Sequence, residues 1–202
     1  MSIILPGVRA VQTMIERRRP FNRIFGIGLP KTGTTSLAAA LELLGFQSLH
    51  CPRRFREMIH AGQYFFPEEH KGKRWDALTN FGEQHWEQLD KAFPGSKFIL
   101  TTRKTETWLE SCSQHYAKPR KGIHGKATLE IFGMSVFHEA RFRAIMRGQA
   151  KSVIDYFKHK PGRLLVVNLC GNPGWLCWKH LCQFLGEEQP DQVFPHNNRR
   201  YH

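Results

Sequence analysis

The residues best suited to bind an anion lie close together in the segment Gly28-Leu-Pro-Lys-Thr-Gly-Thr-Thr-Ser36. Its two glycines allow the backbone to turn sharply, so that successive N–H groups point at one ligand. A strand is predicted over 23–27 and a helix over 35–44, whose N-terminus adds roughly half a positive charge. The segment therefore predicts an anion-binding loop, with contacts expected from Lys31, Thr32, Gly33, Thr34, Thr35 and Ser36.

The glycine spacing of this loop, Gly28-x4-Gly33, fits the frame of the nucleotide-binding motif Gly-x4-Gly-Lys-Ser/Thr. The lysine is displaced, because it is Lys31 inside the loop, and Thr34 occupies the usual lysine position. This displacement points away from an ordinary Mg²⁺-dependent nucleoside triphosphatase. A nucleotide or nucleoside kinase with a variant loop is the alternative, which ATP binding and a Mg²⁺ requirement would distinguish.

Arg103 and Ser111 form a second candidate pair. Arg103 follows a predicted buried strand over 97–102, and Ser111 lies eight residues further on, in a helix predicted over 105–115. Ligands of open α/β sheets bind at the carboxyl ends of the strands. We therefore expect Arg103 to lie on the same edge of the sheet as the loop.

Together these residues resemble a known family, the P-loop sulfotransferases. The run Pro30-Lys-Thr-Gly-Thr-Thr35 resembles their phosphosulfate-binding loop, and Arg103 with Ser111 resembles the pair that holds the 3′-phosphate of the donor. The resemblance runs from about residue 23 to 194 and is to small, bacterial-type members. It implies 3′-phosphoadenosine 5′-phosphosulfate (PAPS) as donor, with 3′-phosphoadenosine 5′-phosphate (PAP) as product. It also implies a P-loop NTPase-like, three-layer α/β/α fold around a central parallel sheet.

The resemblance also implies a mechanism. Lys31 would stabilise the charge that develops on the leaving nucleotide, so it is a catalytic as well as a donor-binding candidate. No metal is expected, because a sulfuryl group carries less negative charge than a phosphoryl group. In keeping with this, the predicted strand ends at 99–103 and 166–168 contain no acidic residue.

A general base must take the proton of the acceptor. Sulfotransferases place it at the end of the second or of the third strand, where this chain has His50 and Asp76, respectively, with Asn80, Glu83 and His85 close to Asp76. His50 is the first candidate, because the unperturbed pKa of histidine is near 6.5. A PAP- or PAPS-binding protein without catalytic activity is the alternative if the chain has no base.

The acceptor is expected to be a small molecule or a carbohydrate that offers a hydroxyl or an amine. The segment from Arg53 to Trp75 is basic and aromatic, which suits a partly apolar hydroxyl compound. In cytosolic family members a tryptophan at the position of Ser36 stacks on adenine. We expect an aromatic side chain of the 51–73 segment to replace it.

The elements around these motifs alternate between strand and helix patterns, as a parallel α/β sheet requires. Further strands are predicted over 46–50, 75–79 and 163–169, and further helices over 83–92, 136–157 and 175–185. The segment 51–73 is predicted to be a loop or short helices, and 117–125 a mobile loop. With 202 residues and 41% hydrophobic content, we expect one domain over 21–202, preceded by an N-terminal extension over 1–20.

The charge and the cysteine content limit the classes of binding partner and the cellular compartment that we expect. The formal net charge is +13, but the basic residues are scattered rather than clustered with aromatics, so nucleic acid is not an expected partner. No apolar run reaches the length of a membrane span. Five cysteines without framework spacing favour free thiols, a cytoplasmic location and no metal site. The sequence leaves the oligomeric state open.

Overall fold

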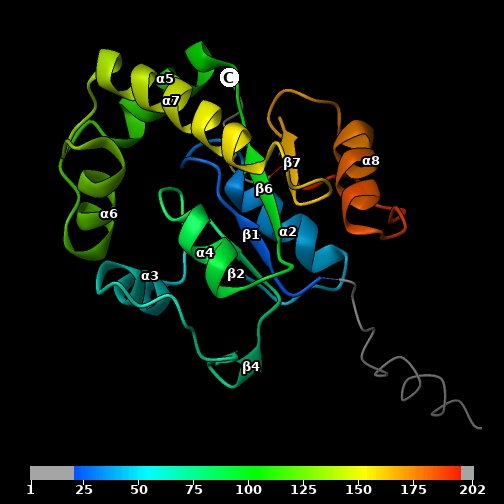
Figure 1. Cartoon of the computed structure of the whole chain (residues 1–202). Coiled ribbons are helices and arrows are strands. Elements are labelled where there is room, and N and C mark those ends of the chain that lie inside the picture. Colours follow the sequence, from blue (N-terminus) through cyan, green and yellow to red (C-terminus); the bar gives the residue numbers. More distant parts are fainter. Residues whose placement is uncertain (1–20, 197–202) are drawn as a thin grey trace, which may run out of the picture.

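The computed structural model describes residues 21–196 and shows a central parallel sheet of five strands (Figure 1). The predicted extension over 1–20 lies outside the described residues. The strand order is β2-β5-β1-β6-β7, with β1 in the middle. The strands are β1 (Ile24–Gly26), β2 (Ser48–His50), β5 (Ala77–Thr79), β6 (Lys97–Thr101) and β7 (Leu164–Val167).

Helices cover both faces of this sheet, which confirms the predicted three-layer α/β/α fold. Side chains alternate along each strand, so that Ile24 of β1 packs on one face and Phe25 on the other. The first face is covered by α2 (Thr34–Leu43) and α8 (Gly174–Leu185). The second is covered by α3 (Arg53–His60), α4 (Trp86–Ala92) and α7 (Glu139–Phe157).

A third apolar cluster lies beyond the carboxyl ends of the strands. It joins α5 (Thr105–His115) and α6 (Gly122–Phe132) to the first half of α7. The rings of Phe132 and Phe142 stack there with centroids 3.9 Å apart, and Trp108 packs against both. In Figure 1, α6 accordingly lies at the far end of the molecule from α8.

The sequence prediction of a loop over 117–125 was wrong for 122–125, because α6 begins at Gly122. Pro119, Gly122 and Gly125 suggested a loop, but Ile123, Ala127 and Ile131 are buried at a spacing of four residues. Gly133 then ends the helix in the left-handed conformation, with φ 68°. Helix α7 is correspondingly shorter than the predicted 136–157. A small antiparallel hairpin, β3 (Glu69–His70) with β4 (Lys73–Arg74), was not predicted either.

The topology brings the chemically interesting segments to one edge. All five strands of the main sheet are parallel, so the loop after β1 and the segments that follow β2, β5 and β6 leave from the same edge. The chain leaves β1 through α2, which covers one face, whereas α4 covers the other. This edge is where an open α/β sheet forms a ligand crevice. Among the described residues, no helix is long and apolar enough to cross a membrane.

Candidate active site

A cavity of about 880 Å³ opens at this edge of the sheet. Its volume lies in the upper part of the range of about 300–1,000 Å³ that is typical of small-molecule sites. The loop after β1 forms one side, and α5, α6 and the segments after β2 and β5 form the others. The lining residues that matter here are Lys31, Gly33, Thr34, Thr35, Ser36, His50, Arg56, Asn80, Arg103, Glu110, Ser111, Arg120 and His124.

Buried hydrogen bonds hold the loop in place. The hydroxyl of Thr32 donates to the carbonyl of Leu29 (2.6 Å) and lies 2.6 Å from the hydroxyl of Thr101 in β6. The indole N–H of Trp108 in α5 donates to the carbonyl of Pro30 (2.8 Å). Thr32 is only 1% exposed and its side chain does not line the cavity. The hydroxyl of Thr32 therefore positions the loop, whereas the sequence predicted that Thr32 contacts the ligand.

Two backbone positions of the loop, Gly28 and Lys31, are sterically restricted. A Cβ at Gly28 would come within 2.8 Å of three atoms of Thr101, so the loop approaches β6 more closely than any other residue type allows. Lys31 adopts φ 73°, a left-handed conformation that is unfavourable for a side chain. Strained residues of this kind occur where the surrounding structure fixes them, and they concentrate at functional sites.

The N-terminus of α2 faces the cavity. Thr34 is the first helical residue, Gly33 is the N-cap with φ 97°, and the first turn contains no acidic side chain. The first N–H groups of a helix have no intrahelical acceptor, and the helix dipole favours an anion next to them. Thr35 and Ser36 line the same part of the cavity. This arrangement suits the phosphate or sulfate group of a ligand.

The structure brings Arg103 and Ser111 to the cavity together with the loop. Nη1 of Arg103 donates to the carbonyl of Lys31 (3.2 Å), and Nε donates to the hydroxyl of Thr107 (3.2 Å). Among the ion pairs of residues 21–196, none includes Arg103. Its positive charge is therefore available to an anionic ligand.

His50 lies at the carboxyl end of β2, next to the loop. Its Nδ1 is 2.9 Å from the hydroxyl of Thr79, and its Nε2 is 3.4 Å from the hydroxyl of Thr35. Partial burial lowers the pKa of His50 below 6.5. The negative charge of Glu83 opposes this shift, and the positive charge of Arg56 adds to it. The imidazole is therefore mainly neutral near pH 7, which is the form that accepts a proton.

Asp76 does not share this position. It precedes β5, whose residues run from Ala77 to Thr79, so it lies at the amino end of the strand, on the opposite edge of the sheet. Its Oδ2 accepts a hydrogen bond from the backbone N–H of Gln47 (2.8 Å), and it does not line the cavity. The prediction that Asp76 lies at the end of the third strand is therefore wrong, because Asp76 comes before the strand and the carboxyl end is at Thr79. This geometry leaves His50 as the base candidate.

The residues after β5 form a wall of the cavity. Asn80 has φ 51°, and its carbonyl accepts a hydrogen bond of 2.5 Å from Nη2 of Arg56. Nη2 also donates to both carboxylate oxygens of Glu83, at 3.0 and 3.1 Å. Burial alone would lower the pKa of Arg56, but the contact with Glu83 outweighs it and raises the pKa. Glu83 is thus committed to a buried ion pair. His85 also contacts a carboxylate, that of Glu130 in α6.

The aromatic residues of the 51–73 segment do not line the cavity, contrary to the prediction that one of them stacks on adenine. Phe55 and Phe66 are stacked on each other in the apolar core, with centroids 5.0 Å apart. The hydroxyl of Tyr64 lies 3.0 Å from Nδ1 of His85, and Phe65 is exposed to solvent. The reason is that α3 turns its apolar side toward the sheet. These residues therefore give no information on the acceptor.

The cavity is instead markedly cationic. Lys31, Arg56, Arg103 and Arg120 line it, and among the described residues Glu110 is the one carboxylate that does so. Sequence reasoning did not select Arg56, Arg120 or His124, because they lie in segments expected to be irregular. The basic residues around 53–56 and 118–121 were visible, but nothing in the sequence shows that they converge. The described residues contain no group of three or more His, Cys, Asp or Glu side chains that could hold a metal ion.

Comparison with known proteins agrees with this geometry. A family model described as a sulfotransferase domain matches residues 23–202. The chain belongs to the sulfotransferase family. It is also similar to the Ava biosynthesis cluster protein M of Aspergillus versicolor, with 27% identity over 213 residues, covering 86% of this chain and 80% of that protein.

Among solved structures, a gluconokinase from Sinorhizobium meliloti 1021 aligns with 84% of this chain and 92% of its own, at 13% identity and a TM-score of 0.40. A likeness at this level carries no inference about activity. The family match is to sulfotransferases, so the kinase alternative is not favoured.

Proposed function

We propose that this sulfotransferase moves a sulfuryl group from PAPS to a hydroxyl or amine acceptor without a metal ion. The observation that carries the proposal is the contact between His50 and Thr35, 3.4 Å from Nε2 to hydroxyl. It places a neutral imidazole directly beside the anion-binding loop. A group that accepts the acceptor's proton therefore lies within reach of the position where the donor is expected.

The cavity residues fit the donor. PAPS supplies the sulfuryl group and carries several anionic groups. In the proposal, the first amides of α2 with Thr34, Thr35 and Ser36 bind its phosphosulfate. Arg103 and Ser111 bind the 3′-phosphate. The cationic lining supports this assignment, because a polyanionic ligand is needed to balance it.

Two residues act on the transfer itself. His50 accepts the proton of the acceptor hydroxyl as the acceptor oxygen bonds to sulfur. Lys31, held by the loop in its left-handed conformation, stabilises the charge on the oxygen that leaves with the nucleotide. Localisation in the cytoplasm and a small-molecule or carbohydrate acceptor are part of the proposal.

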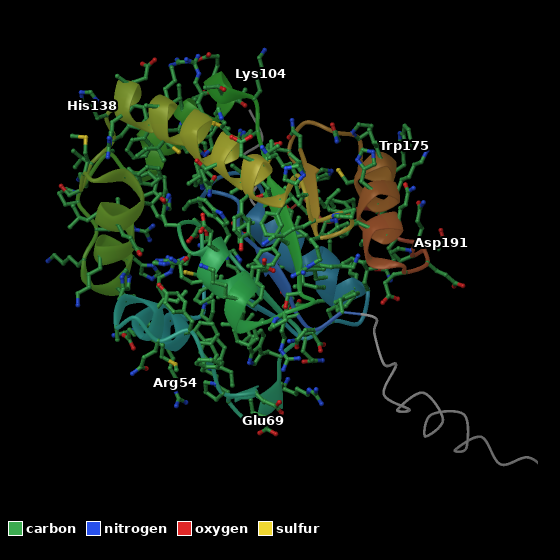
Figure 2. The ribbon with its side chains drawn as sticks, viewed as in Figure 1. Arg54, Glu69, Lys104, His138, Trp175 and Asp191 are labelled. Carbon is green, nitrogen blue, oxygen red and sulfur yellow. The ribbon has the colours of Figure 1, made fainter. Side chains whose placement is uncertain are left out.

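Calorimetric titration tests the donor and its independence from metal. PAP titrated in EDTA should give saturable binding, and ATP with Mg²⁺ should bind far more weakly. Equal or tighter binding of ATP with Mg²⁺ would overturn the proposal in favour of the kinase alternative. Lys104→Ala is a suitable control for later Arg103 variants. Lys104 is the neighbouring cation, is exposed, does not line the cavity and projects at the periphery of the molecule in Figure 2.

A further inference from the structure

The cavity has a second cationic region, apart from the residues assigned to the donor. It consists of Arg56 in α3, Arg120 just before α6, and His124 in the first turn of α6, and we call it the distal cluster. None of these residues belongs to the loop, β6 or α5, which carry the proposed donor contacts. The cluster therefore lies on walls that the donor assignment leaves unused.

A chain of contacts places His50 between the loop and this cluster. Thr35 contacts Nε2 of His50, and Nδ1 of His50 contacts Thr79. Thr79 is followed by Asn80, whose carbonyl accepts from Arg56. The proposed base is thus linked to the loop through Thr35 and to Arg56 of the distal cluster through Thr79 and Asn80. A molecule whose hydroxyl is next to His50 would extend toward Arg56.

One cation of the distal cluster, Arg120, has no matching carboxylate among the described residues. Nη1 of Arg120 donates to Nε2 of His115 (2.6 Å), and Arg120 takes part in no ion pair within residues 21–196. Arg56 is balanced by Glu83, yet its buried Nε has no hydrogen-bond partner in the described part of the chain. Burial lowers the pKa of His124, and the charges of Arg120 and Arg56 lower it further. Glu110, the one carboxylate that the described residues contribute to the cavity, lies in α5 beside Ser111.

We infer that the acceptor is a hydroxyl compound that itself carries a carboxylate, bound by Arg120 with support from Arg56 and His124. The inference rests on the proposed function. A monoanion is favoured because Glu83 already neutralises Arg56, which leaves Arg120 as the uncompensated cation. A guanidinium presents paired N–H donors that fit a carboxylate.

Binding of matched acids and amides tests this inference. The probes are 4-hydroxybenzoate, 4-hydroxyphenylacetate and 3-(4-hydroxyphenyl)propionate, each paired with its neutral amide and titrated with and without saturating PAP. The wild-type protein should bind at least one acid about tenfold to a hundredfold more tightly than its amide, as expected for a charged hydrogen bond. Arg120→Ala should remove this preference, and Arg120→Lys should restore part of it. Lys126→Ala, an exposed cation of α6 that does not line the cavity, should keep it.

The outcomes separate this inference from the donor proposal. If PAP binds but no acid binds more tightly than its amide in any pair, the acceptor inference is wrong and the donor proposal stands. If Arg120→Ala weakens PAP as strongly as Arg103→Ala does, the distal cluster belongs to the donor site and the inference is overturned. If PAP does not bind at all, the donor proposal fails, and the titrations without PAP still decide whether the cluster selects a carboxylate.

Discussion

The two ends of the cavity are built differently. At the donor end, around residues 28–36 and the junction of β6 with α5, positions are fixed by backbone and by short buried hydrogen bonds such as those of Thr32 and Trp108. At the proposed acceptor end, side chains join separate elements: Glu130 of α6 contacts His60 of α3 and His85 at the start of α4. Figure 2 shows Arg54 of α3 on the side of the molecule away from Trp175 of α8.

The two ends of the cavity therefore depend on different kinds of interaction. The donor end depends on strands that run through the apolar core, so a change there disturbs the sheet. The proposed acceptor end depends on polar side chains of α3 and α6. Arg120 and His124 are not part of the sheet and are therefore replaceable without loss of the fold, whereas Arg56 is held in a buried ion pair with Glu83. Substitutions at the two ends should therefore separate folding, donor binding and acceptor selection.

The largest effect is expected at the boundary between the two ends. His50→Ala should lower turnover by about 10²–10⁴-fold, the usual contribution of a general base, while PAP affinity stays within a few-fold. In the wild type, turnover should rise with pH through a midpoint below 6.5, because the pKa of His50 is lowered and only the neutral ring accepts a proton. Steady-state rates over pH 5–8 check both points. An active His50→Ala variant with an unchanged pH profile would show that the base is elsewhere.

Within the donor end, Lys31 and Arg103 should differ in what they affect. Lys31→Ala should lower turnover by about 10²–10³-fold, the range for loss of one group that stabilises the transition state. Arg103→Ala should mainly weaken PAP binding, by about tenfold to a hundredfold, because its charged contact is present before and during transfer. Kinetics combined with calorimetry separate the two, with Lys104→Ala as the charge-matched control. Unchanged PAP affinity in Arg103→Ala would show that the 3′-phosphate binds elsewhere.

The smallest effects are expected when either of two tightly packed glycines is replaced by alanine: Gly28 at the proposed donor end or Gly125 at the proposed acceptor end. An alanine Cβ at Gly28 would lie 1.9 Å from the Thr101 hydroxyl and 2.6 Å from its carbonyl oxygen in β6. At Gly125 it would lie 2.2 Å from the carbonyl of Arg120, in a segment outside the sheet. Overpacking costs about 1–3 kcal/mol, and 1 kcal/mol shifts Tm by about 2–4 °C at this size. Gly28→Ala should therefore lower Tm and weaken PAP binding.

Gly125→Ala should lower Tm less than Gly28→Ala and leave PAP binding intact, because the segment of Arg120 is able to shift. Thermal unfolding and calorimetry measure both variants. Gly148→Ala is the control: a Cβ there meets nothing within 4 Å in the exposed middle of α7, so helix propensity should raise stability by about 0.5–1 kcal/mol. Equal losses of PAP binding at Gly28 and Gly125 would contradict the division between the two ends.

Most strands and helices could be predicted from the sequence, because the period of apolar residues and the turn residues are local signals. The helix over 105–115 has the predicted bounds, and the predicted bounds of β1 and β6 agree with the structure within a few residues. Helix α6 could not be predicted in the same way. Its glycines weaken the local signal, and its stability comes from packing on α7 and α5, above all from Phe132 against Phe142.

By itself, the sequence determined the α/β class, the loop between β1 and α2 and the convergence of that loop with Arg103. Each follows from residues adjacent in the chain and from the common edge of parallel strands. Only the tertiary structure decided which side chains reach the cavity. It turned the Thr32 hydroxyl toward β6, placed Asp76 on the opposite edge and buried Phe55 and Phe66. It also assembled Arg56, Arg120 and His124 from α3 and α6, because side-chain direction and helix packing depend on contacts between residues far apart in the sequence.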